Sequence, residues 1–237
     1  MRRLAALLAL VFTLVAGGCA GADGQRAQEL LAQSDQALAQ VETFRCAGRM
    51  TMSASVGDFG FTMTGGGDAQ PGGSFFVQMQ APELPNFPGT MVVVRGDEAW
   101  MKVGGTWQKL PLPAADLGSM SGIEQFDLTP YVKDVDVDED AVVGGEPAAK
   151  ITGVLDTAGL FEGVLGQLGS FAGPLPEDFS DMLGDTRAVI YVSDATHLPL
   201  RILVDMTMEI EGESVTMHLD YAITDVNEPV KVPGPGA

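Results

Sequence analysis

The chain has 237 residues, of which 46% are hydrophobic, enough for an apolar core in one sizeable domain or two small ones, so disorder throughout is excluded. Its 32 acidic and 13 basic residues give a net charge of −19. Because such a surface repels nucleic acid and anionic headgroups, we expect no nucleic-acid partner, and any membrane attachment should come from acyl chains.

The first 18 residues have the pattern of a secretory signal. Arg2 and Arg3 precede an apolar stretch from Leu4 to Ala16, and small residues follow it. This stretch is too short and wrongly flanked for a spanning helix. Without Arg2 and Arg3 the remaining chain has 11 basic against 32 acidic residues, a net charge of −21.

Two processing sites fit the end of this signal. The sequence AGGC, from Ala16 to Cys19, resembles a bacterial lipobox, which implies cleavage before Cys19 and acylation of that cysteine, for example with palmitate. Position 16 departs from the pattern, which prefers Leu. The alternative is ordinary secretion with a cut after Ala22, using Ala20 and Ala22 as the small residues. We favour the lipobox because the cysteine follows the apolar stretch at the expected place.

The second cysteine, Cys46, cannot form an internal disulfide if Cys19 carries lipid, so the fold must depend on its core. Cys46 is in phase with Phe44, Met50 and Met52. We expect it to act as a small buried hydrophobic residue.

A short tether, residues 19–25, should connect the anchor to the domain, and its last six residues span at most about 20 Å. A helix is expected from Arg26 to Thr43. Its apolar residues recur at helical spacing, namely Leu30, Leu31, Ala37, Leu38 and Val41.

The apolar period then changes to two, which predicts strands. Residues 44–56 and 59–63 form a hairpin that turns at Gly57 and Asp58. Further strands are expected at 74–81, 90–95, 98–103 and 106–110, and the last two are joined by the tight turn Gly104-Gly105. Antiparallel strands of this kind form a meander.

Between Pro111 and Gly184 the pattern breaks. We expect short helices at 114–120 and 122–131, a longer helix at 157–171 capped by Asp156, and another short helix after Pro176. A hairpin at 132–143 and 148–155 lies between them, and three strands follow at 186–193, 198–211 and 214–226.

About eleven strands with few helices predict an α+β fold that is mainly β, built on a curved antiparallel sheet. We expect one domain, residues 26–228, followed by a flexible tail at 229–237.

Residues Asp134 to Asp140 begin like a calcium loop, with carboxylates at 134, 136 and 138. The rest of the loop fails, because Glu139 stands where an EF-hand needs Gly, and Gly145 where it needs Glu. Since Val135 and Val137 alternate with the acids, we prefer a strand with one solvated face.

The two histidines do not suggest catalysis. His218 is out of phase with the apolar residues of its strand and should face solvent, and His197 lies in a turn. No nucleophile and base can be paired from these residues. We therefore expect no enzyme, no metal and no cofactor.

Methionines are frequent on the apolar faces of the predicted strands. For one methionine an ordinary core position is the better interpretation. For seven together we prefer a deformable surface that accepts variable shapes. The residues of this surface are Met50, Met52, Phe59, Phe61, Met63, Phe75, Val77, Met79, Val204, Met206, Met208, Met217 and Leu219.

The lipobox, the first helix, the hairpin WMKVGGTWQKL (100–110) and the segment AVIYVSDATHLPLRILVDM (188–206) together resemble LppX/LprG-type lipoproteins and, more widely, the LolA/LolB-like fold. This resemblance implies a curved half-barrel whose concave apolar face, covered by helices, holds acyl chains of a lipid, glycolipid or lipoprotein. The face would be closed by Leu160, Phe161, Leu165, Leu168, Phe179 and Met182.

The sequence thus predicts a monomeric lipoprotein on the outer side of a bacterial cytoplasmic membrane that binds and carries lipid in the cell envelope. The alternative is an envelope sensor or interaction protein that uses the same fold to bind a protein partner. An enzyme ranks third.

Overall fold

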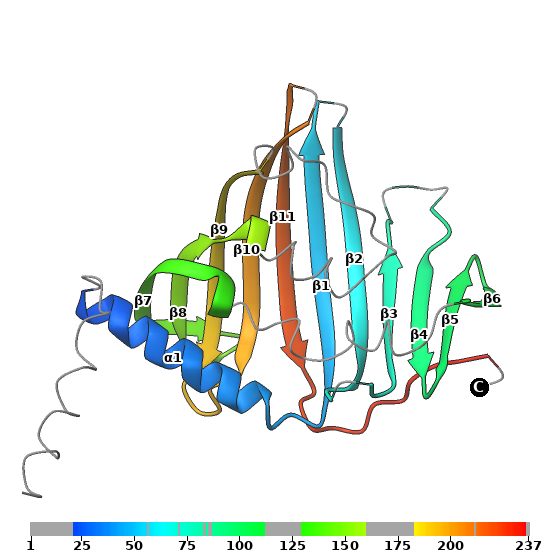
Figure 1. Ribbon diagram of the computed structural model, residues 1–237, viewed down its shortest axis with the longest axis horizontal. Coiled ribbons are helices and arrows are strands. Elements are labelled where there is room, and N and C mark those ends of the chain that lie inside the picture. The colour runs from blue at the N-terminus through cyan, green and yellow to red at the C-terminus, as the bar shows by residue number, and fades with distance from the viewer. Residues whose placement is uncertain are drawn as a thin grey trace, which may run out of the picture.

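The computed structural model describes residues 21–55, 57–70, 72–82, 84, 87–111, 129–159, 183–210 and 212–235. Within these residues, one antiparallel sheet contains eleven strands (Figure 1). They are β1 (Thr43–Ala54), β2 (Gly57–Asp68), β3 (Phe75–Gln80), β4 (Thr90–Arg95), β5 (Glu98–Val103), β6 (Thr106–Lys109), β7 (Val132–Val143), β8 (Glu146–Leu155), β9 (Leu183–Ser193), β10 (Pro199–Ile210) and β11 (Glu213–Thr224). The predicted curved, open antiparallel sheet is confirmed.

The sheet consists of two meanders joined through the first and last strands. Its order is β6-β5-β4-β3-β2-β1-β11-β10-β9-β8-β7, so β6 and β7 are its edges and β1 pairs with β11. Strands that follow one another in the chain are neighbours within each meander. Most of these neighbours are joined by short segments, whereas residues 156–182 join β8 to β9. The β1–β11 pair brings the two ends of the domain together.

The helix α1 (Ala22–Leu38) lies across one face of the sheet (Figure 1). The predicted range, 26–43, was wrong at both ends. The small Gly24 is buried together with Ala27, which extends the packed stripe toward the N-terminus, and Asp23 suits the positive end of the helix dipole. At the other end Val41 is buried, but its amide bonds to Leu38 O in a turn, so the backbone has already left the helix.

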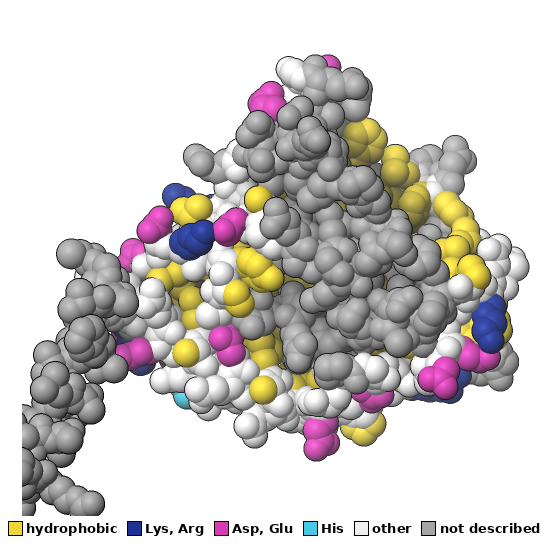
Figure 2. Space-filling model, in the orientation of Figure 1, with side chains coloured by type: hydrophobic (Ala, Val, Ile, Leu, Met, Phe, Trp, Pro, Cys, Tyr) yellow, Lys and Arg dark blue, Asp and Glu magenta, His cyan; other side chains and the backbone are white. Residues whose placement is uncertain are grey.

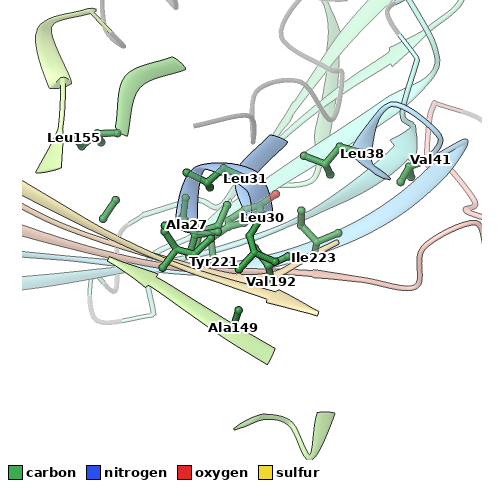
Figure 3. Packing of buried hydrophobic residues seen from close by; sticks show 14 of the residues in the cluster. Ala27, Leu30, Leu31, Leu38, Val41, Ala149, Leu155, Val192, Tyr221 and Ile223 are labelled. Carbon is green, nitrogen blue, oxygen red and sulfur yellow. The ribbon is translucent and has the colours of Figure 1, made fainter. Parts of the chain in front are cut away.

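The main core lies between α1 and the sheet. Leu30 and Leu31 are 4% and 3% exposed, and they belong to one cluster with residues of β1 and β8 to β11. In Figure 3 Leu30 points from α1 toward Val192 and Ile223 on the sheet. We call the sheet face that carries α1 the concave face, and the opposite one the convex face.

Over β10 and β11 the convex face is polar and holds ion pairs. Arg201 binds Asp220 through two nitrogens, at 2.8 and 2.5 Å. His218 lies here, 46% exposed and 2.5 Å from Asp205, so the prediction that it faces solvent is confirmed.

The acidic segment 134–140 belongs to β7. Val135 and Val137 pack against the main core, whereas Asp136 and Asp138 are exposed. This alternation confirms the predicted strand with one solvated face. Asp134 has a φ of 50° where the pairing of β7 with β8 is irregular.

The C-terminal segment runs along one end of the sheet, from β11 toward β5 (Figure 1). The Asn227 amide donates to Thr43 O at 2.8 Å, and the Thr43 hydroxyl donates to Glu228 O. Further along, Gly234 is buried, and a Cβ there would lie 2.6 Å from the Arg95 guanidinium.

The cap at the start of the predicted 157–171 helix is present. Residues 157–159 are helical, and the Gly159 amide donates to Asp156 Oδ1 at 3.0 Å. The pKa of Asp156 is lowered, chiefly by its hydrogen bond with Lys133. Residues 160–171 of that prediction, the signal, the predicted helices 114–120 and after Pro176, and most of 122–131 lie outside the described residues. Residues 129–131 form a short 3₁₀ turn.

Candidate functional site

Strand pairing builds one continuous apolar surface on the concave face. Side chains alternate along each strand, and directly paired residues share a face. In β1 the even-numbered residues from Phe44 to Ala54 therefore share the concave face with odd-numbered residues of β2 and β11. The same reasoning extends the face through β3 to β6 on one side and through β10 on the other.

Methionines and aromatic residues of this face form rows that cross the strands. Met52 is directly opposite Phe59 on β2 and Met217 on β11, and Met217 is opposite Met206 on β10. We call these four residues the methionine row. The next row contains Phe61, Met50, Leu219 and Val204, and the third contains Met79, Met63, Gly48, Tyr221 and Ile202.

Ten of the residues predicted to bind acyl chains thus lie in three adjacent rows. Met208 lies beyond the methionine row, opposite Val215. Val77 lies on the other side, opposite Gly65 and Val92, and is 36% exposed. In Figure 2 hydrophobic side chains are visible on this side of the molecule around β2 to β4.

Two predicted residues are more buried than the others. Met206 is 6% exposed, whereas Met50, Met52 and Met217 are half-buried. Phe75 is also 6% exposed and belongs to a second cluster with Val94, Ala99 and Leu110. Phe75 therefore packs within the protein itself.

The concave face has almost no charge. Among the residues of β1 to β6, β10 and β11 that share it, the only charged one is Glu213, at the first position of β11. The Ser55 hydroxyl donates to this carboxylate between two hairpin tips. The remaining surface is suited to hydrocarbon, because burying an unpaired charge there would be costly.

Gly48 makes room for an aromatic ring in the third row. A Cβ at position 48 would lie 2.8 Å from Tyr221 Cδ2, so the Tyr221 ring covers the glycine. Burial raises the pKa of Tyr221, and its contact with Cys46 adds to this. Burial also raises the pKa of the Cys46 thiol, as expected for a cysteine that acts as a hydrophobic residue.

The sequence did not identify Phe87 as part of this surface. Phe87 lies in the loop between β3 and β4, and its ring meets that of Phe61 edge to face, with centroids 6.0 Å apart. The loop is held by the Phe87 amide, which donates to Leu84 O, and by the Gly104 amide, which donates to Pro88 O. A loop position carries no strand periodicity, so no pattern indicated this contact.

Several predicted residues lie outside the described residues: Cys19, Leu160, Phe161, Leu165, Leu168, Phe179 and Met182. Within the part of the chain that the structure covers, no helix is both long and apolar enough to span a bilayer. In the same part, no group of three or more potential ligand side chains could hold a metal ion.

Comparisons with known proteins bear on the fold. Neither protein-family models nor curated protein sequences give a match. The structure of LprF from Mycobacterium bovis matches with a TM-score of 0.55 and 16% identity, covering 92% of this chain and 100% of LprF. The lipoprotein LppX from Mycobacterium tuberculosis matches with a TM-score of 0.53 and 16% identity, covering 88% of this chain and 99% of LppX.

A LolA superfamily protein from Nitrosomonas europaea matches with a TM-score of 0.31 and 10% identity, too weak a likeness to support an argument. The two stronger matches cover nearly the whole of both chains. The chain therefore has the fold of LprF and LppX, as the resemblance predicted, and at 16% identity the likeness shows the fold alone.

Proposed function

We propose that this chain, which has the fold of LppX and LprF, binds acyl chains of a lipid, glycolipid or lipoprotein on its concave face and carries them in the cell envelope. The observation that carries the proposal is the set of three adjacent rows of methionine, aromatic and aliphatic side chains. Because methionine side chains adapt their shape, such a surface accepts flexible chains of different lengths.

The energetics of transfer favour a carrier without covalent chemistry. Each CH₂ group removed from water contributes about 0.8 kcal/mol. An acyl chain held in an apolar cavity of about 300–1,000 Å³ therefore recovers most of the free energy that it loses on leaving a bilayer. Exchange between membrane and carrier then needs no ATP. The near absence of charge from the concave face supports this, since no ionised group has to be desolvated there.

We further propose that Cys19 carries the lipid anchor and that Leu160, Phe161, Leu165, Leu168, Phe179 and Met182 close the face over the bound chains. LppX is named a lipoprotein, which agrees with the lipobox-like sequence before Cys19. The domain would then lie at the outer face of the cytoplasmic membrane. Gly159, Gly163, Gly166 and Gly169 lower the helix propensity of that segment by up to about 1 kcal/mol each, which suits a lid that opens.

A test compares two neighbouring residues of β11 that lie on opposite faces. Met217→Asp places a carboxylate on the concave face, whereas Thr216→Asp adds the same charge to the exposed convex face. Met217→Asp should abolish lipid co-purification, and Thr216→Asp should leave it unchanged. Equal lipid content in both variants would contradict the proposal and favour a partner-binding role for the same fold.

A further inference from the structure

Both tryptophans of the chain lie on the convex face of one edge hairpin, away from the concave face. Trp100 is on β5 and Trp107 on β6, and both are half-buried. Trp100 is directly opposite Lys109, and Lys102 is directly opposite Trp107. The two aromatic and two cationic residues therefore alternate in a square at the edge of the sheet.

Each lysine covers the ring of its opposite tryptophan. Lys102 Nζ is 5.5 Å from the centroid of Trp107, and Lys109 Nζ is 5.7 Å from that of Trp100. Lys109 also binds Glu98 at 2.5 Å and is 55% exposed. The ammonium groups are thus held beside the indole rings, with Lys109 exposed and Lys102 half-buried.

Apolar residues of the next two strands extend this square. Val93 of β4 is directly opposite Trp100 and is fully buried, and Phe76 of β3 follows it in the same row. Met91 lies beside Lys102 in the second row. We call Phe76, Met91, Trp100, Lys102, Trp107 and Lys109 the tryptophan–lysine patch.

The charge of this region opposes that of the whole protein. Strands β4 to β6 and the turn between β4 and β5 carry three cationic residues, Arg95, Lys102 and Lys109, and two acidic residues, Asp97 and Glu98, a net charge of +1. The whole chain has 32 acidic and 13 basic residues. An anionic surface is therefore repelled by most of the protein and attracted by this hairpin.

We propose that the tryptophan–lysine patch docks the protein onto an anionic phospholipid surface. Indole rings favour the boundary between headgroups and acyl chains, and lysine side chains extend from that depth to the phosphates. A stacked sugar is a poorer fit, because a lysine ammonium already occupies a face of each ring. The patch does not depend on lipid binding by the concave face, which lies on the other side of the sheet.

The place of the patch gives this contact a role. The hairpin of β5 and β6 lies at the end of the sheet opposite the start of α1 (Figure 1). A membrane contact there orients the whole sheet, whereas an attachment through the N-terminus alone leaves the far end free to move. The two contacts together lay the sheet against a lipid surface.

The test uses the intrinsic fluorescence of the full chain, because every tryptophan signal comes from the patch. The protein is reconstituted through its own N-terminus into vesicles of phosphatidylcholine and phosphatidylglycerol brominated near the glycerol end of the acyl chains. We expect blue-shifted, quenched emission. If the vesicles neither shift nor quench the emission, the proposal is overturned. If a soluble oligosaccharide shifts the emission and the vesicles do not, the patch binds a sugar.

Two variants give the matched comparison. In the double variant in which Gln replaces Lys102 and Lys109, the affinity for vesicles that contain phosphatidylglycerol, measured by quenching, should fall about fivefold for each lysine lost. Each basic residue near an anionic surface strengthens binding by about this factor. Lys150→Gln, on the convex face of β8, should leave quenching unchanged. Equal quenching in both variants contradicts the proposal.

A lipid held on the concave face could also quench the tryptophans. The variant Met208→Asp distinguishes this from docking through the patch, because it changes the concave face alone. Retained quenching in Met208→Asp supports docking through the patch, even if this variant has lost its bound lipid. Quenching that disappears together with the bound lipid overturns docking and leaves the proposed function intact.

Discussion

Met52 and Met217 lie directly opposite each other on the concave face, although they belong to the first and last strands of the sheet. Phe59 and Met206 continue the same row on the outer sides of this pair. Four flexible or aromatic side chains thus form a band across β2, β1, β11 and β10. The band joins the two meanders, and we propose that acyl chains bind against it.

Replacing Met52 and Met217 together by Leu should preserve stability but narrow the range of ligands. Leu has a similar volume, so the free energy of unfolding should change by less than about 1.5 kcal/mol for each site. Its branched side chain adapts less well, so fatty acids of different length should differ more in affinity than they do for the natural protein. Displacement of a fluorescent fatty acid measures this, and an unchanged range of affinities would contradict the role given to methionine.

Phe87 should slow the release of bound acyl chains. Its ring covers Phe61 edge to face, and aromatic pairs of this kind contribute about 0.5–1.5 kcal/mol beyond the area they bury. Phe87→Ala should therefore raise the dissociation rate up to roughly tenfold, measured by stopped-flow transfer to vesicles. Pro88→Ala, in the exposed next position, is the control and should have the natural rate.

Gly48→Ala should destabilise the protein by about 1–3 kcal/mol, because the new methyl group overlaps the Tyr221 ring. Denaturant unfolding measures this cost. In a Tyr221→Ala background only the 3.2 Å contact with Asp220 O remains, and Ala is preferred over Gly in a strand, so the same change should cost less. An equal cost in both backgrounds would show that the ring does not determine the need for glycine.

The Arg201–Asp220 pair should contribute to stability in a pH-dependent way. The hydrogen bond from Arg201 lowers the pKa of Asp220, so the carboxylate form is favoured in the folded state. Its contribution is complete above the unfolded pKa of about 3.9 and is lost as pH falls through the lower folded value.

Asp220→Asn should therefore cost up to about 1 kcal/mol at neutral pH, as expected for a partly exposed pair, and the difference should shrink below about pH 4. Arg201→Gln breaks the same pair from the other side and should show the same dependence in acid unfolding. A cost independent of pH would mean that packing, and not charge, is lost.

Local patterns predicted the strands but not their long-range partners. Three strands, Thr90–Arg95, Glu98–Val103 and Val132–Val143, have the predicted bounds, because an apolar period of two and glycine turns fix them locally. The order that places β1 beside β11 depends on contacts between the two ends of the chain, which no local pattern encodes. The end of α1 was misplaced because the buried Val41 continues the helical stripe beyond the last helical residue, Leu38.

The same limit applies to the candidate site. Strand periodicity placed Met50, Met52, Met217 and Leu219 on one face, and pairing confirms that they share it. Periodicity could not reveal that Tyr221 covers Gly48, since this depends on the register between strands distant in sequence. Nor could it separate Phe75, which packs in its own cluster, from the half-buried residues of the rows.

Mass spectrometry of the intact protein extracted from membranes detects both the anchor and a carried lipid. We expect a covalent mass increase at Cys19 from acylation and, under native conditions, an additional noncovalent lipid that is lost in Met217→Asp and retained in Thr216→Asp. A natural protein that carries no lipid besides its anchor, in membranes that contain acyl lipids, would contradict the proposed function.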